Sequence, residues 1–168
     1  DELRLFTNQF YNNLVPSAVD IYSESSDLIV KSDLMLEMSG QRIIPDEGNG
    51  WNFTALRDIN FYLQYSHNCT EVNARSRYDG VARFFRAYFL FDLMQQFGAI
   101  PMPLEPVFEA QTYIPRTPVD KVYTQIIEDL KYCADYNYLP KTAERGRVRI
   151  GAAQHLLAKV YLTRGSAV

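Results

Sequence analysis

One segment of helical periodicity, from about residue 70 to residue 97, constrains the fold of this chain more than any other feature. Apolar residues recur there at three- and four-residue steps, namely Tyr78, Val81, Ala82, Phe85, Tyr88, Phe89 and Leu93. Gly98 stands where a glycine often follows a helix, and Pro101 and Pro103 cannot continue one. The sequence therefore predicts one long amphipathic helix that ends sharply after residue 97.

Four further helices are predicted. Thr117 as N-cap, Pro118 at the first helical position and Asp120 two residues later mark the start of a helix that ends around Leu139 and Pro140. Residues 51–65 and, more weakly, residues 3–14 have helical patterns. A last helix places these residues inward: Ala152, Ala153, Leu156, Leu157, Val160 and Tyr161.

The helices are separated by long irregular segments. Five prolines fall between residues 101 and 118, and residues 45–50 have loop chemistry. The spacing of Ala82 and Ala87 recurs in Ala153 and Ala158, about two periods of a 34-residue helical repeat later. With 168 residues, the chain is expected to form a single domain, 1–168, that is all-α, with tetratricopeptide-like antiparallel helical hairpins and long irregular loops.

Charge and composition argue against several functions. Seventeen Lys and Arg against 20 Asp and Glu give a net charge of −3, whereas nucleic-acid binding relies on a basic excess. No stretch approaches the roughly 20 apolar residues that span a bilayer. Two histidines and two cysteines show no metal-ligand spacing, and no nucleophile or nucleotide-binding motif is present. We expect no nucleic acid partner, metal, cofactor or catalytic residue.

Two groups of residues have both a structural and a functional interpretation. Arg83 and Arg86, after Arg75 and Arg77, could hold a carboxylate or phosphate, but arginines beside the apolar face of a helix more often pair with acids of a packed neighbour. Asp92 and Asp129 are the expected partners. An aromatic group has the same two interpretations, packing being the commoner one: Tyr113, Tyr132, Tyr136 and Tyr138.

Cys69 and Cys133 also leave two possibilities open. The two thiols could form a disulfide in an oxidising compartment. More simply, each cysteine is a small apolar residue within a helix. The sequence favours the second interpretation.

Trp51 is the best candidate for contact with a ligand. Sugar sites use flat aromatic faces against the apolar side of a pyranose, with amides and charged groups for the hydroxyls. Arg42, Asp46, Asn49 and Asn52 surround Trp51 in a glycine-rich loop, and aromatic residues are unusually frequent at 14%. A tryptophan at a helix start can equally cover a core. The predicted ligand-binding residues are therefore Arg42, Asp46, Asn49, Trp51 and Asn52.

Read together, several stretches resemble the SusD/RagB family of outer-membrane nutrient-binding lipoproteins of Bacteroidetes. The matching stretches are 82–93 with the Phe-Gly-x-x-Pro turn at 97–101, 116–130, 146–162 and, more weakly, 56–60. Their order and spacing agree with the family from about residue 50 to residue 165. Val81, and Arg149 with Ile150, depart from the usual pattern, which puts local helix geometry in doubt.

The resemblance implies a function and a location. It implies cell-surface binding of glycans, starch and other polysaccharides among them, for uptake through a SusC-like TonB-dependent outer-membrane barrel. It also implies a longer protein, of which this chain is the N-terminal helical part, held at the outer membrane through a lipid anchor that the chain lacks. The alternatives are a peptide-capturing RagB-like member and a helical-repeat module that binds another protein.

Overall fold

The computed structural model describes residues 1–15, 40, 52–106, 114–135 and 138–166, and these residues form an all-helical structure. The helices are α1 (Glu2–Leu14), α2 (Thr54–Tyr65), α3 (Val72–Phe97), α4 (Val119–Asp135) and α5 (Ile150–Ser166), with a short 3-10 helix, η1 (Ser66–Asn68), between α2 and α3. Within these ranges the chain has no strand, and an isolated antiparallel bridge joins Ile100 to Thr117. The predicted all-α class is confirmed.

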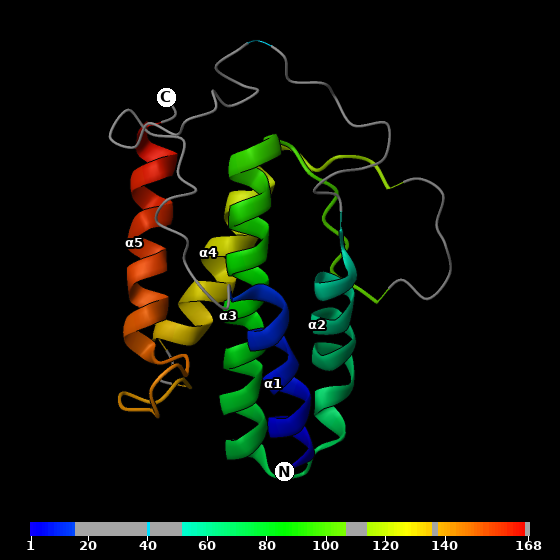
Figure 1. The fold of residues 1–168 in the computed structure, drawn as a ribbon, viewed down its shortest axis with the longest axis vertical. Coiled ribbons are helices and arrows are strands. Elements are labelled where there is room, and N and C mark those ends of the chain that lie inside the picture. The colour runs from blue at the N-terminus through cyan, green and yellow to red at the C-terminus, as the bar shows by residue number, and fades with distance from the viewer. Residues whose placement is uncertain (16–39, 41–51, 107–113, 136–137, 167–168) are drawn as a thin grey trace.

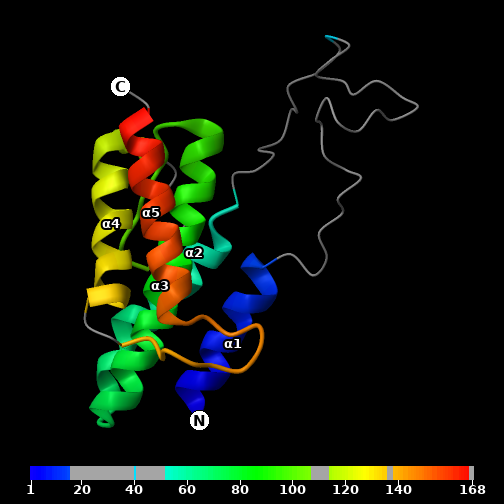
Figure 2. The same cartoon turned by 90° about the vertical axis from the view of Figure 1, so that its left-hand side faces the viewer.

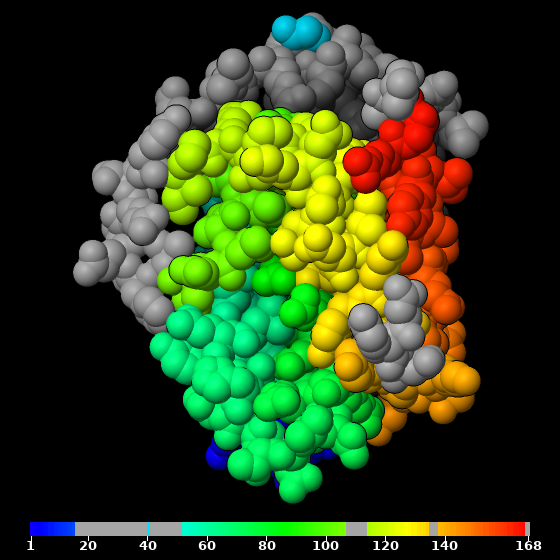
Figure 3. Space-filling view, turned by 180° about the vertical axis from the view of Figure 1, so that it is seen from behind, coloured from blue at the N-terminus to red at the C-terminus, as the bar shows by residue number. Residues whose placement is uncertain are grey.

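Consecutive helices run in opposite directions, as tetratricopeptide-like hairpins do. The long helix α3 stands in the centre, with α1 and α2 beside its first half and α4 and α5 on its other side (Figures 1 and 2). From behind, α4 covers the middle of the molecule, α5 flanks it, and α1 is almost hidden (Figure 3). The arrangement gives α3 neighbours on several sides.

The core is built around α3, and this differs from the one-sided pattern that the sequence predicts. Buried residues occur at consecutive positions of α3, at 80–82, 85–87, 90–91 and 93–94, so more than one face of the helix is covered. A helix that is buried on several sides needs apolar residues around much of its circumference. Phe85 and Leu90 are essentially inaccessible to solvent and belong to one core cluster with Leu56 and Ile59 of α2 and Ile126 of α4.

The end of α3 follows the sequence prediction. Gly98 has φ 70° and ψ −118°, a conformation that is strained for any residue with a side chain, and its N–H donates to the carbonyl of Met94 at 2.8 Å. Ile100 is fully buried, and its carbonyl accepts from the N–H of Thr117 at 2.7 Å. The proline-rich segment that follows α3 therefore returns to the start of α4.

Some predicted boundaries and faces need correction. Helix α2 begins at Thr54 rather than at residue 51, and α4 ends at Asp135, before Leu139. Tyr161 was predicted to point inward, but its side chain is 45% exposed. Each residue of a helix turns about 100° from the one before, so Tyr161 points away from the buried stripe that contains Val160.

Candidate ligand-binding site

Most of the residues predicted to bind a ligand lie outside the described part of the chain. These are Arg42, Asp46, Asn49 and Trp51. Asn52 is described and exposed, two residues before α2, and its side-chain carbonyl accepts a hydrogen bond from the N–H of Thr54 at 3.0 Å. The side chain of Asn52 thus satisfies one of the free N–H groups at the start of α2, and its amide nitrogen remains a donor.

The start of α2 is anchored to α3. The ring of Phe53 meets the ring of Phe89 edge to face, with 6.1 Å between their centroids. Leu56 is fully buried one turn later. The residues that directly precede α2 are therefore attached to a fixed point of the helical scaffold.

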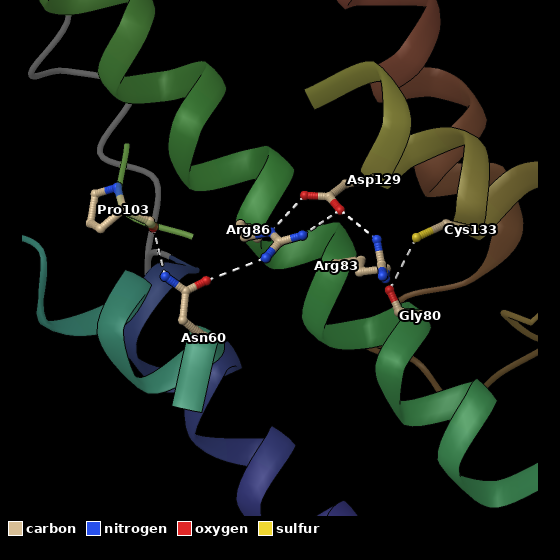
Figure 4. Close-up of polar contacts among 7 residues, drawn as sticks. All are labelled: Asn60, Gly80, Arg83, Arg86, Pro103, Asp129 and Cys133. Carbon is tan, nitrogen blue, oxygen red and sulfur yellow. Dashed lines mark hydrogen bonds and ion pairs between the residues drawn. The ribbon is translucent and has the colours of Figure 1, made fainter. Parts of the chain in front are cut away.

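A buried polar network joins α2, α3 and α4 (Figure 4). Asp129 of α4 is completely buried and accepts from Nε and Nη2 of Arg86, each at 2.7 Å, and from Nη1 of Arg83 at 3.0 Å. Arg86 also donates to Oδ1 of Asn60 at 3.3 Å, and Nδ2 of Asn60 donates to the carbonyl of Pro103 at 2.7 Å. All donors and acceptors named in this network are groups of the protein itself.

The structural interpretation of the basic strip, the four arginines between residues 75 and 86, is therefore confirmed for Arg83 and Arg86. Asp129 is the acid of the packed neighbour, as the sequence predicts. Asp92 is a different case, because it is exposed and accepts from Nε2 of Gln96 at 2.9 Å. Asp92 lies on the solvent side of α3, whereas the face of α3 that carries Arg86 points to α4.

The described tyrosines of the predicted aromatic group pack together. The rings of Tyr132 and Tyr138 lie 4.6 Å apart, and the guanidinium of Arg83 lies 4.3 Å from the ring of Tyr132. Tyr113 and Tyr136 lie outside the described residues. Cation–π and ring contacts of this kind hold α4 against α3. These contacts agree with the packing interpretation for Tyr132 and Tyr138.

A second buried polar group lies between α2 and α3. Tyr62 is buried, and neither its hydroxyl nor Oδ1 of Asp79 has a hydrogen-bond partner among the described residues. Burial raises the pKa of the Asp79 carboxyl, against the opposing influence of Ser66 and the positive Arg75 nearby. Burial, and then the negative charge of Asp79, raise the pKa of the Tyr62 hydroxyl. The Tyr62 hydroxyl and Oδ1 of Asp79 are buried, whereas Asp79 as a whole is half-buried.

The two thiols are free. Cys133 is fully buried in α4, and its thiol donates to the carbonyl of Gly80 at 3.1 Å. Burial raises the pKa of the Cys133 thiol to about 12. Cys69 is half-buried and directly follows η1 rather than lying within a helix. The prediction of a small apolar helix residue thus holds for Cys133 alone.

One pocket is lined by charged and aromatic side chains. A volume of about 230 Å³ lies between α1, the first turns of α3 and the link from residue 140 to residue 148, which passes close to α1 (Figure 2). We call it the arginine pocket, and its charged and aromatic lining consists of Arg4, Arg77, Arg147, Tyr11, Tyr78 and Glu144. Val81, Pro140 and Val148 supply apolar surface. Such a mixture of guanidinium, phenol and apolar groups suits an anionic organic ligand.

Contacts among the lining residues hold the arginine pocket in shape. Nη1 of Arg147 donates to Oδ1 of Asn8 at 2.5 Å, and its guanidinium lies 4.9 Å from the ring of Tyr11. The hydroxyl of Tyr11 accepts from the N–H of Val148 at 3.0 Å, and the ring of Tyr11 meets that of Phe85 edge to face at 4.7 Å. Tyr11 thus connects the link to the core.

Sequence patterns do not reveal this pocket. Its residues come from three segments that lie about 70 residues apart, and each segment has an unremarkable helix or loop pattern on its own. Arg77 stands out only as part of the basic strip, and Arg147 only through the family resemblance of residues 146–162. The three arginines come together because α1 packs on α3 near the link, and the sequence alone does not show that packing.

Neither a metal site nor a membrane span is found among the described residues. Groups of three or more His, Cys, Asp or Glu side chains that could hold a metal ion do not occur there. Each described helix is too short or too polar to cross a bilayer.

Comparison with solved structures identifies the fold. A SusD superfamily protein from Bacteroides thetaiotaomicron matches 99% of this chain and 43% of its own, with a TM-score of 0.77 and 21% identity. A laminarin-binding SusD-like protein matches 66% of this chain and 24% of its own, with a TM-score of 0.60 and 28% identity. The chain therefore has the helical fold of SusD-like proteins, over a fraction of their length.

Sequence comparison identifies the family. SusD-like protein P2 of Formosa agariphila is 39% identical over 87 residues, which are 50% of this chain and 17% of the relative. The SusD-like family pattern, described as starch-binding and associating with the outer membrane, matches residues 45–162. Because that match covers well over half of the sequence, the chain belongs to the SusD-like family.

Proposed function

We propose that this chain is part of a protein that captures glycans at the cell surface for uptake. The observation that carries the proposal is the family match over residues 45–162, in a family described as starch-binding. A relative with the same helical fold is a laminarin-binding protein, which adds a second polysaccharide to the class of ligands. The proposed ligand class is therefore oligosaccharides and polysaccharides.

The proposed ligand-binding residues are Arg42, Asp46, Asn49, Trp51 and Asn52. The ring of Trp51 would stack on a sugar, and the amides and charged groups would bond to the hydroxyls. The position of Asn52 supports this assignment, because Asn52 is exposed and adjoins a helix start that Phe53 anchors on Phe89. Ligand-binding segments that are mounted on a rigid scaffold bind at a smaller entropic cost.

Capture and transfer, without catalysis, is the proposed activity. In the proposed system the whole protein is a lipid-anchored outer-membrane protein of a Bacteroidetes cell, and it passes its ligand to a SusC-like TonB-dependent barrel. The association of the family with the outer membrane supports this location. The chain spans 17% of the curated relative, so activity and partners are proposed for the whole protein and not for this segment alone.

Calorimetric titration tests the proposal. Starch, laminarin and other neutral oligosaccharides are titrated into wild-type protein and into Trp51→Ala. We expect saturable binding of at least one glycan, and about tenfold weaker binding by the variant, since covering one ring face is worth roughly 1.5 kcal/mol. The matched control is Tyr161→Ala, which removes an exposed ring from α5 and should leave the affinity unchanged.

Asn49→Ala guards against a folding defect in the Trp51 variant, because it removes a single amide. Circular dichroism and melting temperature are recorded for every variant. Failure of all glycans to bind to folded wild-type protein would contradict the proposal. Retained binding of peptides would then favour the peptide-capturing alternative, and binding of a protein partner would favour the interaction module.

A further inference from the structure

We propose that the arginine pocket binds the acidic group, a carboxylate or a sulfate ester, of a saccharide. This inference rests on the proposed function, because it assumes that the ligand is a saccharide. The subsite is formed by α1, α3 and the link 140–148.

The charge of the pocket is opposite to that of the chain. Arg4, Arg77 and Arg147 bring three positive charges to the lining, and Glu144 brings one negative charge. The chain as a whole has a net charge of −3, so a local excess of positive charge is not a consequence of composition. A concave site with charge of one sign raises the local concentration of oppositely charged ligands.

Two of the three guanidinium groups have no acidic partner among the described residues. None of the ion pairs between described residues involves Arg77 or Arg147. Arg4 lies 3.9 Å from Asp1, in a pair whose two side chains are 59% and 91% exposed, and such pairs contribute little. The charges of Arg83 and Arg86, by contrast, are paired with the buried carboxylate of Asp129. The arginine pocket therefore keeps unneutralised positive charge for a ligand.

The pocket is preorganised. Arg147 is positioned by Asn8 and by the ring of Tyr11, and Tyr11 is itself fixed by Val148 and Phe85. A guanidinium that uses one nitrogen to bind Asn8 still has donors for a carboxylate or sulfate oxygen. Because these contacts exist without ligand, little side-chain entropy is lost on binding.

The size and remaining lining fit a sugar ring. A volume of about 230 Å³ is below the roughly 300 to 1,000 Å³ of sites for drug-sized ligands, and it suits one ring with its acidic substituent. Tyr11 and Tyr78 offer aromatic surface, and Val81 and Val148 offer apolar surface for the C–H groups of the ring. A bare inorganic anion would leave the aromatic and apolar surface of the pocket unused.

Matched pairs of ligands test the inference. Wild-type protein is titrated with uronic-acid oligosaccharides, namely galacturonate, glucuronate and mannuronate oligomers, and with the methyl esters of the same compounds. A second arm compares sulfated galactan oligosaccharides with their desulfated forms. Both arms keep the sugar and remove the charge, and together they distinguish a carboxylate from a sulfate. We expect at least one acidic form to bind about tenfold more tightly than its neutral counterpart, the contribution of one charge-assisted hydrogen bond.

Variants connect that preference to the pocket. Arg77→Gln removes an exposed guanidinium and should abolish the preference for the acidic form while leaving binding of the neutral form intact. Arg145→Gln is the matched control, because Arg145 is also exposed and belongs to the same link but does not line the pocket. Arg147→Gln should have the same effect as Arg77→Gln.

The outcomes separate this inference from the proposed function. Binding of neutral glycans with no preference for any acidic form would overturn the inference and leave the proposed function in place. Equal loss in Arg77→Gln and Arg145→Gln would also overturn it, because the effect would then come from net charge alone. Absence of binding by every saccharide, neutral or acidic, would overturn both proposals.

Discussion

Asp129 shows how one buried carboxylate can organise three elements. It accepts three hydrogen bonds from Arg83 and Arg86, and Arg86 continues through Asn60 to the carbonyl of Pro103 (Figure 4). The bidentate pair of Arg86 with Asp129 is a geometry that lysine cannot reproduce. The sequence predicted Asp129 as a partner of these arginines, because a partly buried acid on a packed helix needs a group that pairs with its charge. It could not identify Pro103, because that contact joins segments 43 residues apart.

Asp129→Ala should destabilise the protein strongly. The substitution leaves the buried guanidinium of Arg86 without its counter-charge, which costs about 3 to 5 kcal/mol in free energy of unfolding. Urea denaturation followed by circular dichroism measures the change. The control Asp92→Ala removes an exposed carboxylate of α3 and should change stability by about 0.5 kcal/mol or less. A loss below about 1 kcal/mol for Asp129→Ala would show that the network is not structural.

Asp79→Asn should stabilise the protein at neutral pH but not at acid pH. Burial raises the native pKa of Asp79 above its usual value of 3.8, so the native state keeps a proton that the unfolded state has released. Raising the pH through 3.8 therefore lowers the free energy of unfolding, until the native pKa is passed. Asparagine removes this penalty. We expect a gain over wild type at about pH 7 and no gain at about pH 3.

Asp92→Asn serves as the control for exchanging a carboxylate for an amide, because Asp92 is exposed on the same helix. Both variants and the wild type are compared by urea denaturation at the two pH values. An equal gain for Asp79→Asn at both would assign the effect to packing and contradict the role of titration.

At the scale of elements, the end of α3 was more predictable than its buried faces. Gly98 and the prolines after it determine the end of α3 through local backbone conformation, which can be predicted directly from these residue types. The burial of α3 on several faces depends on which helices surround it, and periodicity alone does not contain that information. Tyr161 illustrates the same limit, because its neighbour Val160 is fully buried while Tyr161 is 45% exposed.

Gly80 within α3 and Gly98 directly after it should respond oppositely to alanine. Gly98→Ala places a side chain at φ 70° and ψ −118°, which should cost about 1 to 3 kcal/mol. Gly80→Ala adds a methyl group within the helix that meets Leu139 at 3.4 Å, an ordinary contact, and helix propensity should add about 0.5 to 1 kcal/mol of stability. Thermal denaturation of both variants checks this. Destabilisation by Gly80→Ala would show that α3 and Leu139 are packed too tightly for a methyl group.

At the scale of the whole molecule, the order of several short motifs predicted more than any motif alone. The stretches at 82–93, 97–101, 116–130 and 146–162 led to the family that the comparisons show. The residues proposed to bind a ligand were harder to predict. The arginine pocket assembles side chains from α1, α3 and the link, so its existence depends on tertiary packing. Specificity in such scaffolds resides in loops and links, whose chemistry varies independently of the core.

The central claim is that the protein binds saccharides without altering them. Saturation-transfer difference NMR of folded protein with an oligosaccharide panel tests both parts in one sample, because it detects contact with the sugar and then monitors its anomeric signals over a day. The account predicts transfer to at least one oligosaccharide, with an unchanged anomeric spectrum. No transfer to any saccharide would contradict capture, and new reducing-end signals would contradict binding without catalysis.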